Sequence, residues 1–108
     1  MSNEVIHINK DTFDDVLKSA GENTVLVDFW APWCGPCRAL APVLDQVAET
    51  LGAKAVIAKV NVDDNPELAE RFGVSSIPAL FFFKEGSVVK KLVGSRPAAD
   101  IIEEIQSV

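Results

Sequence analysis

Residues 25–37 read VLVDFWAPWCGPC and contain both cysteines of the 108-residue chain. The first part of this stretch is apolar, as in a buried strand, and apolar side chains recur at helical spacing from Leu40 to Leu51. A strand, a tight turn and a helix are therefore expected, with Cys34 at the helix N-terminus. Unpaired backbone N–H groups and the positive end of the helix dipole favour an anion there, and so lower the pKa of a thiol.

The residues between the two cysteines suit this arrangement. Gly35 lets the backbone turn tightly, and Pro36 fits a first helical turn, where its missing N–H costs nothing. Cys37 follows three residues after Cys34, on the same helical face and close enough to bond to it. The pattern indicates a dithiol that opens and closes, and therefore redox chemistry.

Two other interpretations of the cysteine pair stay open. A structural disulfide that closes a ring of four residues contributes only about 2 kcal/mol, against nearly 5 kcal/mol for a long loop. Structural zinc takes four ligands, but the chain has no third cysteine and a single histidine, His7. We therefore favour redox chemistry, expect no metal site, and expect His7 to be solvated or packed instead of catalytic.

Composition indicates one globular domain over residues 1–108. Hydrophobic residues make up 48% of the chain and charged residues 24%, and the formal net charge is −6 with no basic block. Nucleic acid and anionic membrane surfaces are therefore poor partners. The first twenty residues lack a signal-peptide core, and no stretch is long enough to span a bilayer. We expect a cytoplasmic protein, in which a disulfide is transient and catalytic.

Two charged residues fall inside apolar strands. Asp28 lies six residues before Cys34, and burial there would raise the pKa of its carboxyl and suit it to accept and return protons. The alternative is a carboxylate that reaches solvent at the strand end. Lys59 lies in the apolar stretch 55–62 and is a candidate partner of Asp28, the alternative being an ordinary surface lysine.

The remaining pattern predicts strands and helices that alternate before a final hairpin. Parallel crossovers are expected first and an antiparallel edge last. The expected elements are a strand at 5–8, a helix capped by Asn9 or Asp11 and ending at Gly21, a strand at 24–30, a helix kinked near residues 38–42 by Pro42 and ending at Gly52, a strand at 55–62, a helix capped by Asn65, strands at 79–83 and 88–93 joined by Glu85-Gly86, and a last helix. Residue statistics alone predict a trans bond before Pro78, since only about one X-Pro bond in twenty is cis.

Taken together, these features resemble the thioredoxin family over essentially the whole chain. The residues that carry the resemblance are Val27 to Cys37 with Gly-Pro between the cysteines, Pro42, Lys59 to Asp63, Asn65-Pro66, Ile77-Pro78, Phe83-Lys84 with Gly86, and Val93-Gly94. The resemblance implies an α/β thioredoxin fold, with a central mixed five-stranded sheet flanked by four helices.

The resemblance also implies a mechanism. Cys34 would be the attacking thiolate and Cys37 the buried resolving thiol, with Asp28 as proton acceptor for Cys37 and Lys59 beside it. It implies that Pro78 is cis, against the residue statistics. The surface that meets substrates would consist of Trp33, Gly35, Pro36, Ile77, Pro78 and Gly94.

The implied activity is reduction of protein disulfides by a monomer without a bound cofactor. A flavin-containing thioredoxin reductase that uses NADPH is the implied electron donor. Two rivals are a disulfide donor on the same fold and a non-enzymatic docking module built around Trp33. Ala79, Ser75-Ser76 and Arg38 depart from the commoner family residues, which puts partner preference in doubt but not the chemistry.

Overall fold

The computed structural model describes residues 4–108, which form five strands, four α-helices and a short 3-10 turn at Gly52–Lys54. The strands are β1 (Ile6–His7), β2 (Thr24–Trp30), β3 (Ala55–Asn61), β4 (Ala79–Lys84) and β5 (Ser87–Val93). The helices are α1 (Phe13–Ser19), α2 (Gly35–Leu51), α3 (Pro66–Arg71) and α4 (Ala98–Ser107). The order of elements expected from the sequence is confirmed.

The strands form one mixed sheet in the order β1-β3-β2-β4-β5. β1, β3 and β2 run parallel, whereas β4 is antiparallel to β2 and β5 is antiparallel to β4. The hairpin between β4 and β5 turns at Glu85 and Gly86, whose φ angles of 49° and 84° are both positive. Such a turn matches the twist of the strands that it joins.

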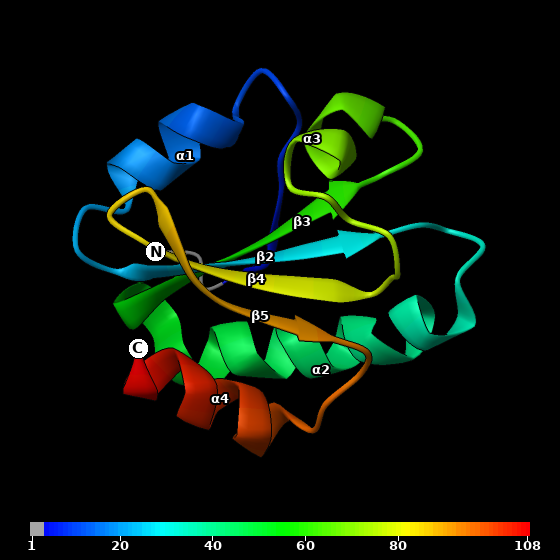
Figure 1. Cartoon of the computed structure of the whole chain (residues 1–108). Coiled ribbons are helices and arrows are strands. Elements are labelled where there is room, and N and C mark those ends of the chain that lie inside the picture. Colours follow the sequence, from blue (N-terminus) through cyan, green and yellow to red (C-terminus); the bar gives the residue numbers. More distant parts are fainter. Residues whose placement is uncertain (1–3) are drawn as a thin grey trace.

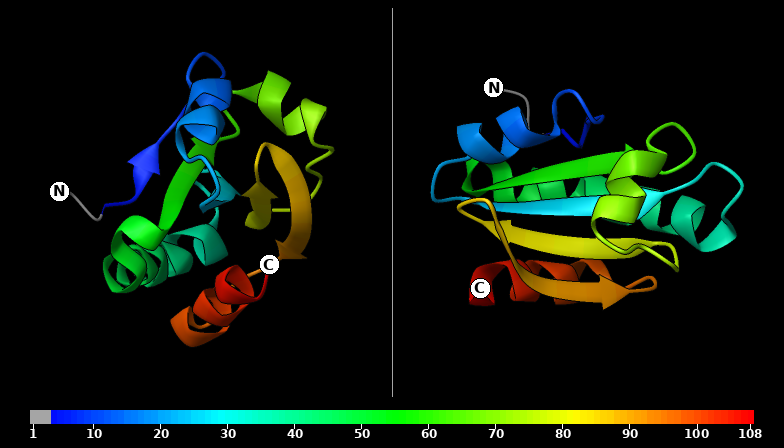
Figure 2. Two further views of the ribbon diagram at one scale, coloured as in Figure 1. Left: turned by 90° about the vertical axis from the view of Figure 1, so that its left-hand side faces the viewer. Right: turned by 45° about the horizontal axis from the view of Figure 1, so that its top comes forward.

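Helices cover both faces of the sheet, with α1 and α3 on one side and α2 and α4 on the other (Figures 1 and 2). Alternate residues of β2 therefore enter different cores. Val25, Val27 and Phe29 pack under α1 and α3, while Leu26 packs with the apolar residues of α2 and α4. This central position explains why β2 is apolar on both faces, and it is also what buries Asp28.

Two local details differ from the sequence-based expectations. The first strand is limited to two residues, although the Ile8 N–H still donates to the Lys59 carbonyl at 2.9 Å. Asn9 closes the turn before α1 instead of capping the helix, because its Oδ1 accepts from the N–H groups of Asp11 and Thr12 at 2.8 and 3.1 Å. The helix itself begins at Phe13.

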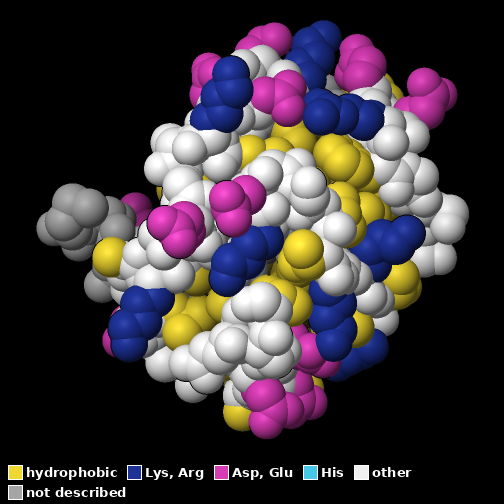
Figure 3. Space-filling view, turned by 60° about the vertical axis from the view of Figure 1, so that its left-hand side comes forward, with side chains coloured by type: hydrophobic (Ala, Val, Ile, Leu, Met, Phe, Trp, Pro, Cys, Tyr) yellow, Lys and Arg dark blue, Asp and Glu magenta, His cyan; other side chains and the backbone are white. Residues whose placement is uncertain are grey.

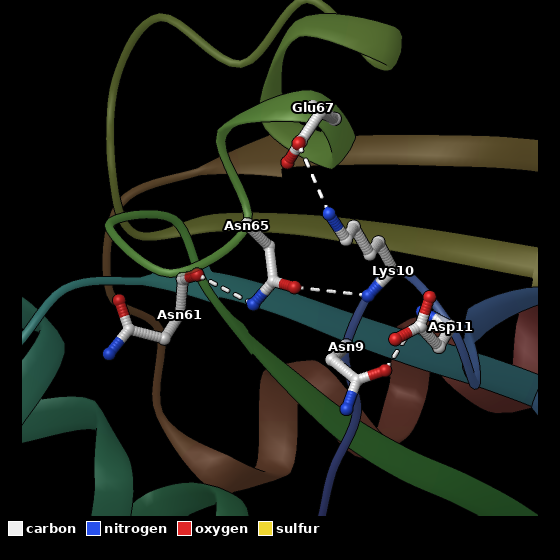
Figure 4. Close-up of polar contacts among 6 residues, drawn as sticks. All are labelled: Asn9, Lys10, Asp11, Asn61, Asn65 and Glu67. Atoms are coloured by element: carbon white, nitrogen blue, oxygen red, sulfur yellow. Dashed lines mark hydrogen bonds and ion pairs between the residues drawn. The ribbon is translucent and has the colours of Figure 1, made fainter.

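Asn65 occupies the N-cap position of α3 as expected, but its side chain does not cap the helix. Its Oδ1 accepts from the Lys10 N–H at 3.0 Å, and its Nδ2 donates to the Asn61 carbonyl at 3.0 Å (Figure 4). The side chain is 5% exposed. Asn65 therefore ties the segment after β1 to the segment after β3.

Acidic and basic side chains are interspersed on the face of the molecule shown in Figure 3, and no extended basic patch forms there. Within residues 4–108, none of the helices combines the length and the apolar character that crossing a membrane would require.

Candidate active site

The cysteine pair lies at the beginning of α2. Cys34 is the N-cap residue with an extended backbone (φ −87°, ψ 112°), and its Sγ accepts a hydrogen bond from the Cys37 N–H at 3.2 Å. Pro36 is in the first turn, where no helical N–H is lost. The position at the helix N-terminus that the sequence predicts is therefore confirmed, and the sulfur of Cys34 meets the backbone donor that stabilises a thiolate.

The two cysteines are joined by a disulfide with a Cα–Cα distance of 5.2 Å. They differ in access to solvent, since Cys34 is 6% exposed and Cys37 is completely buried. Both pack in a small apolar cluster with Ala31, bordered by Trp30 and Val62. An incoming disulfide can therefore reach Cys34 but not Cys37.

Asp28 is completely buried in β2. Its strand neighbours are Lys59 on β3 and Leu80 on β4, and it points to the face of the sheet that α2 covers. Neither carboxylate oxygen has a hydrogen-bond partner among the described residues. Loss of solvation raises the pKa of Asp28 from 3.8 to about 7, although the nearby Lys59 ammonium acts in the opposite direction. The carboxyl can therefore exchange a proton near neutral pH.

Lys59 is the register partner of Asp28 and is 7% exposed, so it is not an ordinary surface lysine. Its Nζ lies 4.5 Å from the centroid of the Trp30 ring and makes no hydrogen bond to the Asp28 carboxylate. Trp30 lies on the same face of β2, two residues after Asp28, and offers the ammonium its aromatic surface. Lys59 thus influences the pKa of Asp28 through space and not through a hydrogen-bonded ion pair.

The surface around Cys34 contains the other expected site residues. Trp33 is 68% exposed, and its Nε1–H donates to Asp63 Oδ2 at 3.0 Å, which holds the indole in place. Gly35 and Pro36 are also exposed at the start of α2. Asp63 was not predicted from the sequence, because nothing in the order of residues shows that it lies under Trp33.

The loop before β4 forms the other side of this surface. The Ile77-Pro78 bond is cis, as the resemblance implies and against the residue statistics. The Ile77 carbonyl oxygen lies 4.0 Å from Cys34 Sγ, and the Gly94 N–H donates to the Pro78 carbonyl at 2.8 Å. The structure therefore brings Trp33, the dithiol and the segments at Ile77 and Gly94 together.

An apolar groove of about 300 Å³ lies beside Trp33. The sequence analysis named Trp33 and Ile77 as contact residues and Ser75 as bearing on partner preference, but it did not assign the other lining residues to the site, because they come from separate elements. The groove is lined by Trp33, Val62, Pro66, Ala69, Val74, Ser75 and Ile77. Such a surface suits an extended apolar segment of a substrate.

His7 is exposed and lies edge-on to Trp30, with 6.2 Å between the ring centroids. Between residues 4 and 108, no group of three or more His, Cys, Asp or Glu side chains is placed to hold a metal ion.

Comparisons with known proteins span this whole arrangement. The family model described as thioredoxin matches residues 4–107. A thioredoxin from Alicyclobacillus acidocaldarius subsp. acidocaldarius is 50% identical over 88 residues, which cover 82% of this chain and 84% of that protein. A thioredoxin from Haemophilus influenzae is 47% identical over 98 residues, 91% of each chain. The crystal structure of thioredoxin F from spinach chloroplast (short form) matches with a TM-score of 0.89 at 34% identity, over 97% of this chain and 93% of that one.

Proposed function

This chain belongs to the thioredoxin family and is a dithiol-disulfide oxidoreductase, and from that premise we propose that it reduces protein disulfides through attack by Cys34. The observation that carries the proposal is the difference between the two sulfurs. Cys34 is at the N-terminus of α2 with 6% of its surface exposed, whereas Cys37 has none. Only Cys34 combines access with an environment that stabilises a thiolate.

The reaction proceeds in two exchanges. The Cys34 thiolate attacks one sulfur of the substrate disulfide, so that a mixed disulfide forms and the other substrate sulfur leaves as a thiolate. Cys37 then attacks Cys34 Sγ, the mixed disulfide breaks, and the second substrate sulfur leaves. Two electrons have then moved to the substrate, and the protein is left with the Cys34–Cys37 disulfide. No bound cofactor is needed, because the cysteines themselves carry the electrons.

Asp28 is the proposed acceptor of the Cys37 proton. Trp30, which shares its face of β2, packs against the cluster that contains Cys37. A pKa of about 7 leaves the carboxyl able both to take the thiol proton and to return it. Lys59 tunes this pKa downward, which keeps part of Asp28 ionised near neutral pH.

The substrate side is assigned to the exposed surface around Cys34. The proposed contact residues are Trp33, Gly35, Pro36, Ile77, Pro78 and Gly94. Support comes from the Ile77 carbonyl 4.0 Å from Cys34 Sγ, from the hydrogen bond between Gly94 and Pro78, and from the groove that Trp33 and Ile77 line together. Apolar side chains and main-chain groups dominate the surface, so it suits many protein substrates and not one side-chain pattern.

The cellular setting follows from the same reasoning. We expect a cytoplasmic monomer with residues 1–108 acting as a single domain, and a flavin-containing thioredoxin reductase that uses NADPH as its electron donor. The mixture of charges on the face in Figure 3 and the net charge of −6 support protein partners over nucleic acid or membranes.

Trapping of mixed disulfides tests the two cysteine roles. Cys37→Ser should accumulate covalent complexes with a protein disulfide substrate, because the resolving thiol is missing. Cys34→Ser should accumulate none, and a variant with both substitutions serves as the control. The complexes are counted on non-reducing gels, and equal trapping by the two single variants would reverse or abolish the assigned roles.

A redox titration against glutathione tests the direction of the reaction. A reductase requires that the Cys34–Cys37 pair be more reducing than glutathione. A more oxidising pair would identify a disulfide donor on the same fold. If the variant with both Cys34 and Cys37 replaced by serine kept the protein's cellular function, the protein would act as a docking module and not as a reductase.

A further inference from the structure

A second cavity, of about 460 Å³, lies beside β1 and β3 and shares no lining residue with the groove beside Trp33. Trp30 and Lys59 line it together with His7, the segment after β1 and the segment after β3. Its size is within the range of small-molecule sites. Neither cysteine lines this cavity, so the exchange reaction does not account for it.

Lys59 is the unusual member of this lining. The residue is 7% exposed, and its Nζ makes no hydrogen bond or ion pair with any described residue. The Trp30 ring lies beside this ammonium, and its own Nε1–H is buried and without a partner among the described residues. The Lys59 ammonium has no contacting anion, and an anion in the adjoining cavity would give it one.

Two asparagines add further donors. Asn61 Oδ1 accepts from the Asp63 N–H at 2.9 Å, and Asn9 Oδ1 accepts from the Asp11 N–H at 2.8 Å. These contacts occupy the oxygen ends of both amides, so that each keeps its NH₂ group as a donor. Figure 4 shows the contact of Asn9 with Asp11. Both asparagines line the cavity.

Two carboxylates oppose this donor set. Asp11 and Asp64 also line the cavity, but both are exposed, so water and salt screen them more strongly than they screen Lys59. The remaining cation, Lys10, forms an ion pair with Glu67 at 3.4 Å. We propose that this cavity binds a small carboxylate anion, held by the Lys59 ammonium and the neighbouring N–H donors.

Binding at this site would be linked to Asp28. An anion beside Lys59 offsets the positive charge that lowers the Asp28 pKa, so a bound anion raises that pKa. By reciprocity, ionisation of Asp28 lowers the affinity of the site for the anion. The titratable groups that line the site are His7 on β1, Lys10 and Asp11 after β1, Lys59 on β3 and Asp64 after β3. Asp28 does not line it but is the strand neighbour of Lys59. Neutralisation of Asp28 favours binding of the anion, so the affinity should fall as pH rises through about 7.

Titration of the oxidised protein with sodium acetate tests the proposal. The amide and indole NMR signals are followed at about pH 6, with sodium chloride at matched ionic strength as the reference. Acetate should change the chemical shifts of the Trp30 indole and of Asn9 and Asn61, and these changes should saturate at millimolar acetate. A Trp33→Phe variant assigns the two indole signals. Identical shifts in chloride would show an effect of ionic strength only and would overturn the proposal.

Substitutions with opposite expected effects sharpen this test. Lys59→Met should lower the affinity for acetate at least about tenfold. Lys18 is an exposed lysine on α1, and Lys18→Met should leave the affinity for acetate unchanged. Asp11→Asn and Asp64→Asn should each raise the affinity for acetate about twofold, because each removes a negative charge that repels the anion. These exposed asparagine variants keep the test decisive even if Lys59→Met does not fold. Unchanged affinity in a folded Lys59→Met protein, or weaker binding in both asparagine variants, would refute the site. Since no thiol chemistry is involved, this result is independent of the proposed reductase activity.

Discussion

The pH dependence of stability gives a direct test of the environment assigned to Asp28. Burial raises its pKa from 3.8 to about 7, so between these values the folded protein holds a proton that the unfolded chain has lost. Stability must therefore fall as pH rises through this range and level off above it. At about 1.4 kcal/mol for each tenfold change, the full effect amounts to about 4 kcal/mol. Asp28→Asn replaces the carboxyl by a neutral group of the same shape and should abolish this loss.

Urea denaturation of the oxidised proteins at a series of pH values measures the effect. Asp28→Asn should match the native protein within about 1 kcal/mol near pH 4 and exceed its stability by up to about 4 kcal/mol near pH 9. Asp45→Asn, an exposed substitution on α2 with the same change in net charge, should differ little at any pH. A difference between Asp28→Asn and the native protein that does not grow with pH would refute the reasoning.

The remaining predictions concern Trp33 and Asn65. Trp33→Ala should raise KM for a protein disulfide about tenfold and affect a small synthetic disulfide far less, because it removes docking surface and not the thiolate; equal effects on both substrates would contradict the docking role. Asn65→Ala should lower the free energy of unfolding by about 1–3 kcal/mol in urea denaturation, since it leaves the Lys10 N–H without its acceptor and removes one of the two hydrogen bonds that the Asn61 carbonyl accepts from residue 65. Gln46→Ala, exposed on α2, is the matched control, and equal losses in both variants would rule out the bridge.

The parts of the fold that the sequence predicted are those set by local patterns. The position of Cys34 depends on an apolar strand, a turn and an amphipathic helix that follow one another directly. Burial of Asp28 follows from apolar residues on both sides of it in β2. The turn at Glu85-Gly86 likewise reflects backbone angles that these two residues adopt readily.

The parts that could not be predicted depend on which strands become neighbours and in what register. The contact of Lys59 with Trp30 requires β2 and β3 to pair with Asp28 opposite Lys59, and the sequence does not show that register. Asn65 looks like a helix cap locally, yet its side chain binds the segment at Lys10, 55 residues away in sequence. Residue statistics also missed the cis bond at Pro78, which only the resemblance to the family anticipated.

Asp28 is the residue at which stability and the proposed reaction oppose each other. The burial that makes its ionised form unfavourable by about 4 kcal/mol is the same burial that places its pKa near 7, where it can serve the Cys37 thiol. A hydrogen-bonded ion pair with Lys59 would lessen the loss of stability that accompanies ionisation of Asp28. It would also hold the carboxylate ionised, and Asp28 could then no longer take up and return a proton. The position of the Lys59 ammonium over Trp30 avoids that outcome, because the charge acts on Asp28 without binding it. Lys59 therefore affects how readily Asp28 gives up its proton, and any anion bound beside Lys59 would shift that balance.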